Sequence, residues 1–219
     1  MNKKSVIDST TKYIRQKLAS DSSGHDWWHV YRVWKMAKKI AKKEGGKLNL
    51  FVIELASLLH DVVDYKLHGG NEGVGPDTAR GWLEKMNVSR NDIDHVCKII
   101  KDISFRGAGV ESKAKTREGR IVQDADRIDA IGALGIARTF AYGGYKGKLI
   151  YDPNIQPVMH SSFEEYKNNK SPTINHFYEK LLLLEKLMNT HYAKRIAELR
   201  TKFMKKFLSE FYLEWDESR

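Results

Sequence analysis

Apolar residues recur at helical spacing along nearly the whole chain, and no segment alternates apolar and polar residues in the manner of a strand. Only four prolines interrupt this pattern. The pattern predicts an all-α fold. With 219 residues, of which 41% are hydrophobic, the chain is long enough to bury a core of its own. We therefore expect a single-domain helical bundle over residues 1–219.

Breaks in the helical pattern mark the expected ends of the helices. Pro76 suits the first turn of a helix, and Ser89 is a typical N-cap residue. Gly143 and Gly144 are expected to end the helix that precedes them. With these boundaries, we expect helices over residues 4–19, 25–44, 48–61, from 76 onward, 89–103, 118–142, 173–188 and 190–214.

His60 and Asp61 stand side by side after the apolar run of residues 51–59. Neighbouring residues of a helix do not share one face, so these two side chains converge on one point only where the backbone turns at a helix end. Such an arrangement suits a metal ion. His29 and Asp126 offer the same two donor types elsewhere in the chain. The sequence therefore predicts a site of two imidazoles and two carboxylates.

This donor set indicates which ion the site would hold. It contains no thiolate, which argues against a structural zinc site and leaves Mn²⁺, Fe²⁺, Co²⁺, Ni²⁺ and Mg²⁺ open. A divalent ion neutralises phosphate oxygens and lowers the pKa of water, as the hydrolysis of a phosphate ester or anhydride requires. Asp26 precedes His29 by three residues, and we expect it to orient that imidazole.

A second metal motif overlaps the first histidine. His25 and His29 have the i, i+4 spacing by which zinc metalloproteases hold their metal, but Asp26 stands where that motif has Glu. A protease site would also leave the other three predicted ligands unexplained. We therefore expect His25 to lie at the lip of the metal site or behind its ligands.

Charge and cysteine content limit the partners and the compartment. The net charge of +10 favours an anionic partner, but the lysines fall singly or in pairs, which is typical of a solvated surface and argues against nucleic acid. The single Cys97 excludes a disulfide within the chain, so we expect a cytoplasmic location. No apolar run is long enough to span a bilayer, and we expect no membrane partner. A homo-oligomer is left open.

Several strings of the sequence resemble the HD-domain superfamily of metal-dependent phosphohydrolases, in particular its small stand-alone bacterial members. The resemblance covers nearly the whole chain, from about Gly24 to Trp215. It implies an all-α fold with a metal site between helices, a core of about residues 25–142 and C-terminal helices at about 173–214. The strings that carry it are residues 59–66, 104–107, 118–133, 135–144 and 175–181.

The resemblance also implies an activity. At least one similar bacterial protein is a manganese-dependent nucleoside triphosphate pyrophosphohydrolase, which cleaves between the α- and β-phosphates. By this resemblance we expect a small-molecule phosphate substrate, most simply a nucleotide, and Mn²⁺ as the favoured cofactor. The metal ligands that it implies are His29, His60, Asp61 and Asp126.

Residues near these motifs are candidates for catalysis and substrate binding. Asp64 could orient or deprotonate the attacking water, although a loop-capping role is equally open. Lys66 is a second catalytic candidate, acting as a point charge on phosphate. Guanidinium groups can bind phosphate oxygens with two hydrogen bonds, although each could instead form a surface ion pair. The arginines predicted to bind substrate are Arg106, Arg127 and Arg138.

Two other functions are compatible with the sequence. A nucleotidase or phosphodiesterase would use the same metal site, because HD domains share metal chemistry more widely than they share a substrate. A non-catalytic module could bind nucleotide or nucleic acid, with Trp27, Trp28 and Trp82 stacking on bases. The complete set of four metal ligands argues against such a module. We therefore expect an enzyme.

Overall fold

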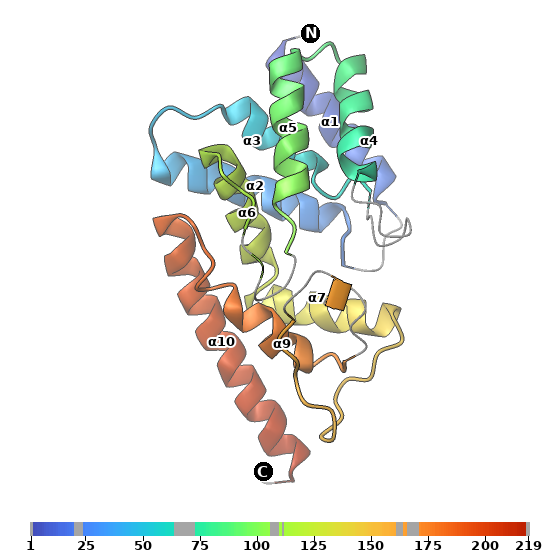
Figure 1. Ribbon diagram of the computed structural model, residues 1–219, viewed down its shortest axis with the longest axis vertical. Helices are drawn as coiled ribbons and strands as arrows, with labels where there is room; N and C mark the ends of the chain where they lie inside the picture. The colour runs from blue at the N-terminus through green and yellow to red at the C-terminus, as the bar shows by residue number, and fades with distance from the viewer. Residues whose placement is uncertain are drawn as a thin grey trace. The chain divides into compact units, whose positions relative to one another are not determined.

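The structure, a computed structural model, consists of helices and connecting segments, with no strand in the ranges that it describes (Figure 1). The predicted all-α fold is confirmed. The chain divides into two compact units, unit 1 (Met1–Phe105 and Glu111–Asp126) and unit 2 (Arg106–Val110 and Arg127–Arg219). The single-domain prediction stays a prediction. The structure describes residues 2–19, 24–63, 73–105, 110, 112–160, 164–165 and 171–217.

Unit 1 is built around α3 (Leu50–Leu59), whose side chains from Phe51 onward are almost all buried. This helix is buried on every side because it packs against α1, α2 and α5. A helix that is apolar all round is expected in such a central position. The other helices of unit 1 are α1 (Lys3–Lys17), α2 (Trp27–Glu44), α4 (Val74–Lys85), α5 (Arg90–Asp102) and most of α6 (Arg117–Asp129).

Polar caps fix where the helices of unit 1 begin. The side chain of Ser89 accepts a hydrogen bond from the backbone N–H of Asp92, which confirms the predicted N-cap of α5. Asn49 caps α3 in the same way. Helix α3 ends at Leu59 and His60 is its C-cap, so the His-Asp pair lies at a helix end as predicted.

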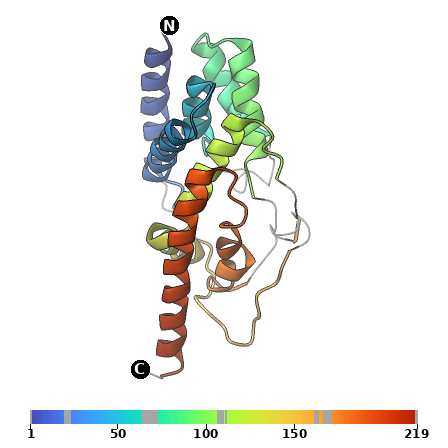
Figure 2. The same ribbon diagram turned by 90° about the vertical axis from the view of Figure 1, so that its left-hand side faces the viewer.

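Unit 2 holds α7 (Gly132–Tyr145), α9 (Asn175–Glu179), the 3-10 helix η2 (Leu181–Leu183) and α10 (His191–Trp215). Helix α10 runs unbroken from His191 to Trp215 (Figure 2) and packs against α7. The ring of Phe177 is fully buried between Phe140 and Phe207. None of the described helices combines the length and apolar character that crossing a bilayer requires.

One predicted helix, over residues 118–142, is wrong because two helices occupy this segment. Helix α6 ends at Asp129, and Gly132 begins α7 with a φ of +80°, a backbone conformation that favours glycine. The guanidinium of Arg200 stabilises the break by donating to the carbonyls of Ile128 at 2.5 Å and Ile131 at 3.4 Å.

Two further boundaries differ from the predictions. Helix α7 continues past Gly143, where an added Cβ would lie 2.2 Å from Thr173 Oγ1, so this glycine permits a close approach instead of ending the helix. The helix expected over residues 173–188 is short and irregular, because the backbone leaves helical geometry at Lys180 (φ −144°, ψ −59°).

Candidate metal centre

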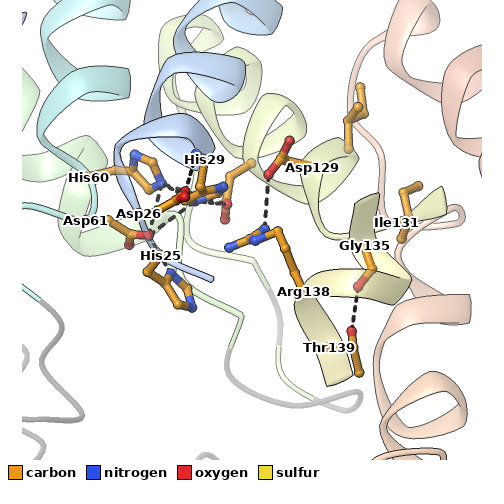
Figure 3. A network of polar contacts seen from close by, with 12 residues as sticks. His25, Asp26, His29, His60, Asp61, Asp129, Ile131, Gly135, Arg138 and Thr139 are labelled. Carbon is orange, nitrogen blue, oxygen red and sulfur yellow. Dashed lines mark hydrogen bonds and ion pairs between the residues drawn. The ribbon is translucent and has the colours of Figure 1, made fainter. Parts of the chain in front are cut away.

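Three helices of unit 1 bring together the four side chains that the sequence singled out. His29 lies in the first turn of α2, His60 and Asp61 directly follow α3, and Asp126 lies near the end of α6. In Figure 3, His29, His60 and Asp61 point toward one another. The donor atoms of His29, His60 and Asp126 lie close enough together to hold one metal ion.

The separations between donor atoms fit a shared ion. His29 Nε2 lies 3.2 Å from Asp61 Oδ2 and 3.6 Å from Asp126 Oδ1. His60 Nε2 lies 3.5 Å and 3.8 Å from the same two oxygens, and 3.2 Å from His29 Nε2. Ligands about 2.1 Å from an octahedral ion lie roughly 3.0 Å apart when adjacent and roughly 4.2 Å apart when opposite. All five separations fall within that range.

The orientation of His60 is set by the end of its own helix. Its Nδ1 lies 2.8 Å from the backbone carbonyl of Ser57 and donates to it in the neutral ring. The lone pair of that ring is then on Nε2, the atom that faces the other donors. Metal-binding histidines are commonly held in this way by a second hydrogen bond.

Asp26 does not have the role that its spacing suggested. It is the N-cap of α2, and its Oδ1 accepts a hydrogen bond from the backbone N–H of His29 at 2.9 Å. The prediction that it orients the imidazole of His29 is therefore corrected, because its recorded contact is to the backbone. By fixing the start of α2, Asp26 still determines where His29 emerges.

His25 contacts the proposed ligand Asp61, which fits the expectation that it lies at the lip of the site or behind its ligands. Its Nδ1 lies 2.6 Å from Asp61 Oδ2, and its ring meets the ring of His29 edge-on at 5.5 Å. His25 precedes α2, so it does not form a helical i, i+4 pair with His29, and the metalloprotease arrangement is absent from this site. It belongs instead with His29 and Asp61 as a second possible group of ligands.

Asp61 is the electrostatic centre of the cluster. Burial raises its pKa, but positive charge on His60 and His25, with hydrogen bonds from His25 and His29, lowers the pKa well below its ordinary value of 3.8. The carboxylate is therefore ionised at neutral pH. The imidazoles of His29 and His60 are 0% and 3% exposed, whereas the side chains of Asp61 and Asp126 are 24% and 34% exposed, so solvent reaches the site on its carboxylate side.

The remaining predicted site residues divide into two groups. Arg127 is buried and donates from Nη1 to the backbone carbonyl of Leu187, a contact that the sequence did not indicate. Arg138 forms an ion pair with Asp129 at 3.2 Å. Both arginines thus have protein partners within unit 2, and their binding to substrate stays a prediction. The predicted residues outside the described ranges are Asp64, Lys66 and Arg106.

Known proteins resemble this chain in sequence and in structure. Residues 27–131 match the HD domain family. The protein YpgQ of Bacillus subtilis is 38% identical over 206 residues, which cover 90% of this chain and 88% of YpgQ. A crystal structure of YpgQ in complex with ADP has a TM-score of 0.70 at 32% identity and covers 95% of this chain and 97% of its own.

Two further crystal structures are similar over almost their full lengths. A Lactobacillus plantarum protein has a TM-score of 0.89 at 40% identity, covering 99% of this chain and 100% of its own. An HD-superfamily hydrolase from Bacillus thuringiensis has a TM-score of 0.72 at 44% identity, covering 98% and 99%. The chain therefore belongs to the HD-domain superfamily and is a phosphohydrolase that depends on a divalent metal ion.

Proposed function

We propose that this enzyme hydrolyses nucleoside triphosphates to nucleoside monophosphate and pyrophosphate. The observation that supports it most directly is the convergence of His29, His60, Asp61 and Asp126, whose measured donor separations are 3.2–3.8 Å. These four residues are the proposed ligands of one divalent ion. Mn²⁺ is favoured by the resemblance to a manganese-dependent bacterial HD hydrolase, whereas the donor set alone leaves Fe²⁺, Co²⁺, Ni²⁺ and Mg²⁺ open.

The proposed ligands have distinct roles in the reaction. When bound, the divalent ion neutralises phosphate oxygens and lowers the pKa of water. Ionised Asp61 supplies negative charge to the site, and His60, held by Ser57, presents a lone pair. His25 restrains the Asp61 carboxylate by its contact of 2.6 Å with Oδ2. Solvent exposure of the two carboxylates provides a side from which a phosphate group can approach.

A nucleotide substrate is supported by a relative and by charge. The YpgQ structure contains ADP, and the two chains share 38% of residues over 206 positions. The net charge of +10 would attract a polyphosphate anion from solution. A cytoplasmic location is part of the same proposal, and the oligomeric state is left open.

Five further residues complete the proposed reaction. Asp64 follows the ligand Asp61 by three positions, and we assign it the orientation or deprotonation of the attacking water. Lys66 would compensate phosphate charge as a point cation. The proposed substrate-binding arginines are Arg106, Arg127 and Arg138.

The decisive experiment is turnover of a panel of nucleoside mono-, di- and triphosphates with added Mn²⁺. Orthophosphate and pyrophosphate are scored separately, and an Asp126→Ala variant serves as the control. We expect pyrophosphate from triphosphates, loss of its release on chelation, and no release by the variant. Orthophosphate alone would replace the proposal with a nucleotidase. A phosphodiester substrate is assayed beside the panel, and its turnover without turnover of any nucleotide would replace the proposal with a phosphodiesterase.

A further inference from the structure

One tryptophan of unit 1 is not explained by packing. Trp27 is buried at 8% exposure. Trp34 donates from Nε1 to Glu54 Oε2 at 2.9 Å. Trp82 stacks on Tyr13 with ring centroids 4.1 Å apart and donates to the hydroxyl of Thr10. Trp28, by contrast, is 56% exposed.

Trp28 lies in the first turn of α2, the turn that also carries the proposed ligand His29. It immediately precedes His29, so their Cα atoms are about 3.8 Å apart and their side chains leave the helix about 100° from each other. The imidazole of His29 is buried among the metal-binding donors, whereas the indole of Trp28 faces solvent. A nucleotide can bridge such a pair of positions, because its ribose separates a flat apolar base from the charged phosphates.

The indole of Trp28 is supported by a row of aromatic rings. Tyr31 meets Trp28 edge-on with ring centroids 5.9 Å apart, and Trp34 meets Tyr31 at 6.2 Å. The hydrogen bond from Trp34 to Glu54 fixes the far end of this row. Tyr31 also contacts Trp27 at 5.8 Å. A ring held in place before a ligand arrives loses less conformational entropy on binding.

We propose that the base of the nucleotide substrate stacks on Trp28 while its phosphates lie at the metal centre. This inference rests on the proposed function and adds the residue that recognises the base. A half-exposed indole offers on the order of 100 Å² of surface, which matches a base but is far below the roughly 800 Å² per partner of a protein interface. Stacking has no preference among bases as strong as a hydrogen-bonded pocket has, so purine and pyrimidine nucleotides should both bind.

Equilibrium binding of ADP to the Mn²⁺-loaded enzyme, measured by calorimetry, tests the proposal without relying on turnover. Trp28→Ala should weaken ADP binding roughly 5- to 150-fold, the loss expected for one stacked base. Trp28→Phe keeps an aromatic face and should stay within about threefold of the wild type. Trp215→Ala is the matched control, because Trp215 in α10 is similarly exposed at 49% and should leave ADP binding unchanged.

Inorganic tripolyphosphate distinguishes base recognition from damage to the metal site. It carries the phosphates without a base, so Trp28→Ala should bind it as the wild type does. Equal weakening for ADP and tripolyphosphate would overturn the proposal, as would unchanged ADP binding by Trp28→Ala, an equal loss in Trp215→Ala or no ADP binding by the wild type.

The outcome also separates this inference from the proposed function. If the wild type binds ADP through Trp28 but releases no pyrophosphate from any triphosphate, the assignment of Trp28 as the base-stacking residue is supported and the proposed reaction is wrong. If the wild type releases pyrophosphate and Trp28→Ala has the same KM and ADP affinity as the wild type, the proposed reaction is supported. The assignment of Trp28 as the base-stacking residue is then wrong.

Discussion

Each unit contains a polar cluster built from histidine and acidic residues, but the two clusters satisfy their polar atoms differently. In unit 2, Glu179 is 1% exposed and accepts hydrogen bonds from Ser171 Oγ at 2.8 Å and from the Val158 backbone N–H at 3.2 Å. His160 Nε2 lies 3.9 Å from its other oxygen. One oxygen of this carboxylate thus has two hydrogen-bond donors, and an imidazole nitrogen lies beside the other.

In unit 1, more imidazole nitrogens converge on one carboxylate oxygen than in unit 2. Three imidazole nitrogens, from His25, His29 and His60, lie within 3.5 Å of one Asp61 oxygen. The facing nitrogens of His29 and His60 are 3.2 Å apart. Without a metal, His25 and His29 can donate hydrogen bonds to this oxygen. A divalent ion would instead accept the lone pairs of His29 Nε2, His60 Nε2 and the carboxylate together. The difference between the units is therefore that several nitrogens converge on one carboxylate oxygen in unit 1, and composition alone does not reveal this.

The largest expected effect is the loss of metal and activity from unit 1. Asp61→Ala or His60→Ala removes a proposed ligand, so bound Mn²⁺ should fall to background and turnover should fall by at least about a thousandfold. Elemental analysis of the purified variants, with a turnover assay, measures both. Glu179→Ala should keep its metal, and full activity in either unit 1 variant would refute the ligand assignment.

The next effect concerns the stability of unit 2. Glu179→Ala leaves the buried Ser171 hydroxyl and Val158 N–H without their acceptor, so the free energy of unfolding should fall by about 2–4 kcal/mol. Urea unfolding of the metal-free protein measures this change. If Glu179→Ala lost Mn²⁺ while unfolding like the wild type, the polar cluster around Glu179 in unit 2 would be a metal site too. The two units would then not differ in metal binding.

A smaller effect is expected at His25, which contacts Asp61 without being one of the four proposed ligands. His25→Ala should weaken Mn²⁺ binding roughly 10- to 100-fold, the usual loss when a residue that holds a ligand is removed. Competition with a chelator of known affinity measures it. His95→Ala is the control, because His95 is a part-buried histidine of unit 1 whose ring contacts Thr116. Complete loss of metal would make His25 a ligand.

The smallest effect is the pH dependence of the metal-free protein. The pKa of Asp61 is lowered on folding, so the unfolded chain binds its proton more tightly than the folded one. The stability that this carboxylate contributes is therefore present above its ordinary pKa of 3.8 and is lost as the pH falls through the lowered folded value. The free energies of unfolding of the wild type and of Asp61→Asn, measured as the pH is lowered, should differ above pH 3.8. They should become equal at the lowest pH values. A constant difference would contradict the pKa shift.

Short-range signals in the sequence were sufficient for the ends of several helices of unit 1 and for the place of His60 and Asp61 at the end of α3. The apolar run of α3 ends at Leu59 with His60 as its C-cap, and Ser89 marks the start of α5. Both features depend on neighbours within a few positions, which periodicity and capping rules describe. Their consequence is a histidine and an aspartate at one helix end.

Contacts between distant residues could not be predicted in the same way. His25 meets Asp61 across 36 positions, and Arg127 meets the carbonyl of Leu187 across 60. The break between α6 and α7 depends on Arg200, which lies 72 positions from Ile128. No local pattern specifies such partners, because they follow from tertiary packing. The role of Asp26 was a different error, since its position at the start of a helix favoured a cap over a ligand partner.

The cap at Asp26 has a consequence for the interpretation of genetic variants. A substitution there would remove about 1 kcal/mol of helix stabilisation and shift the first turn of α2, in which His29 lies. Carriers of such a change would resemble active-site mutants, although the altered residue is not among the proposed ligands. A mutational scan of this enzyme would then overstate the number of catalytic positions unless metal content and folding were scored side by side.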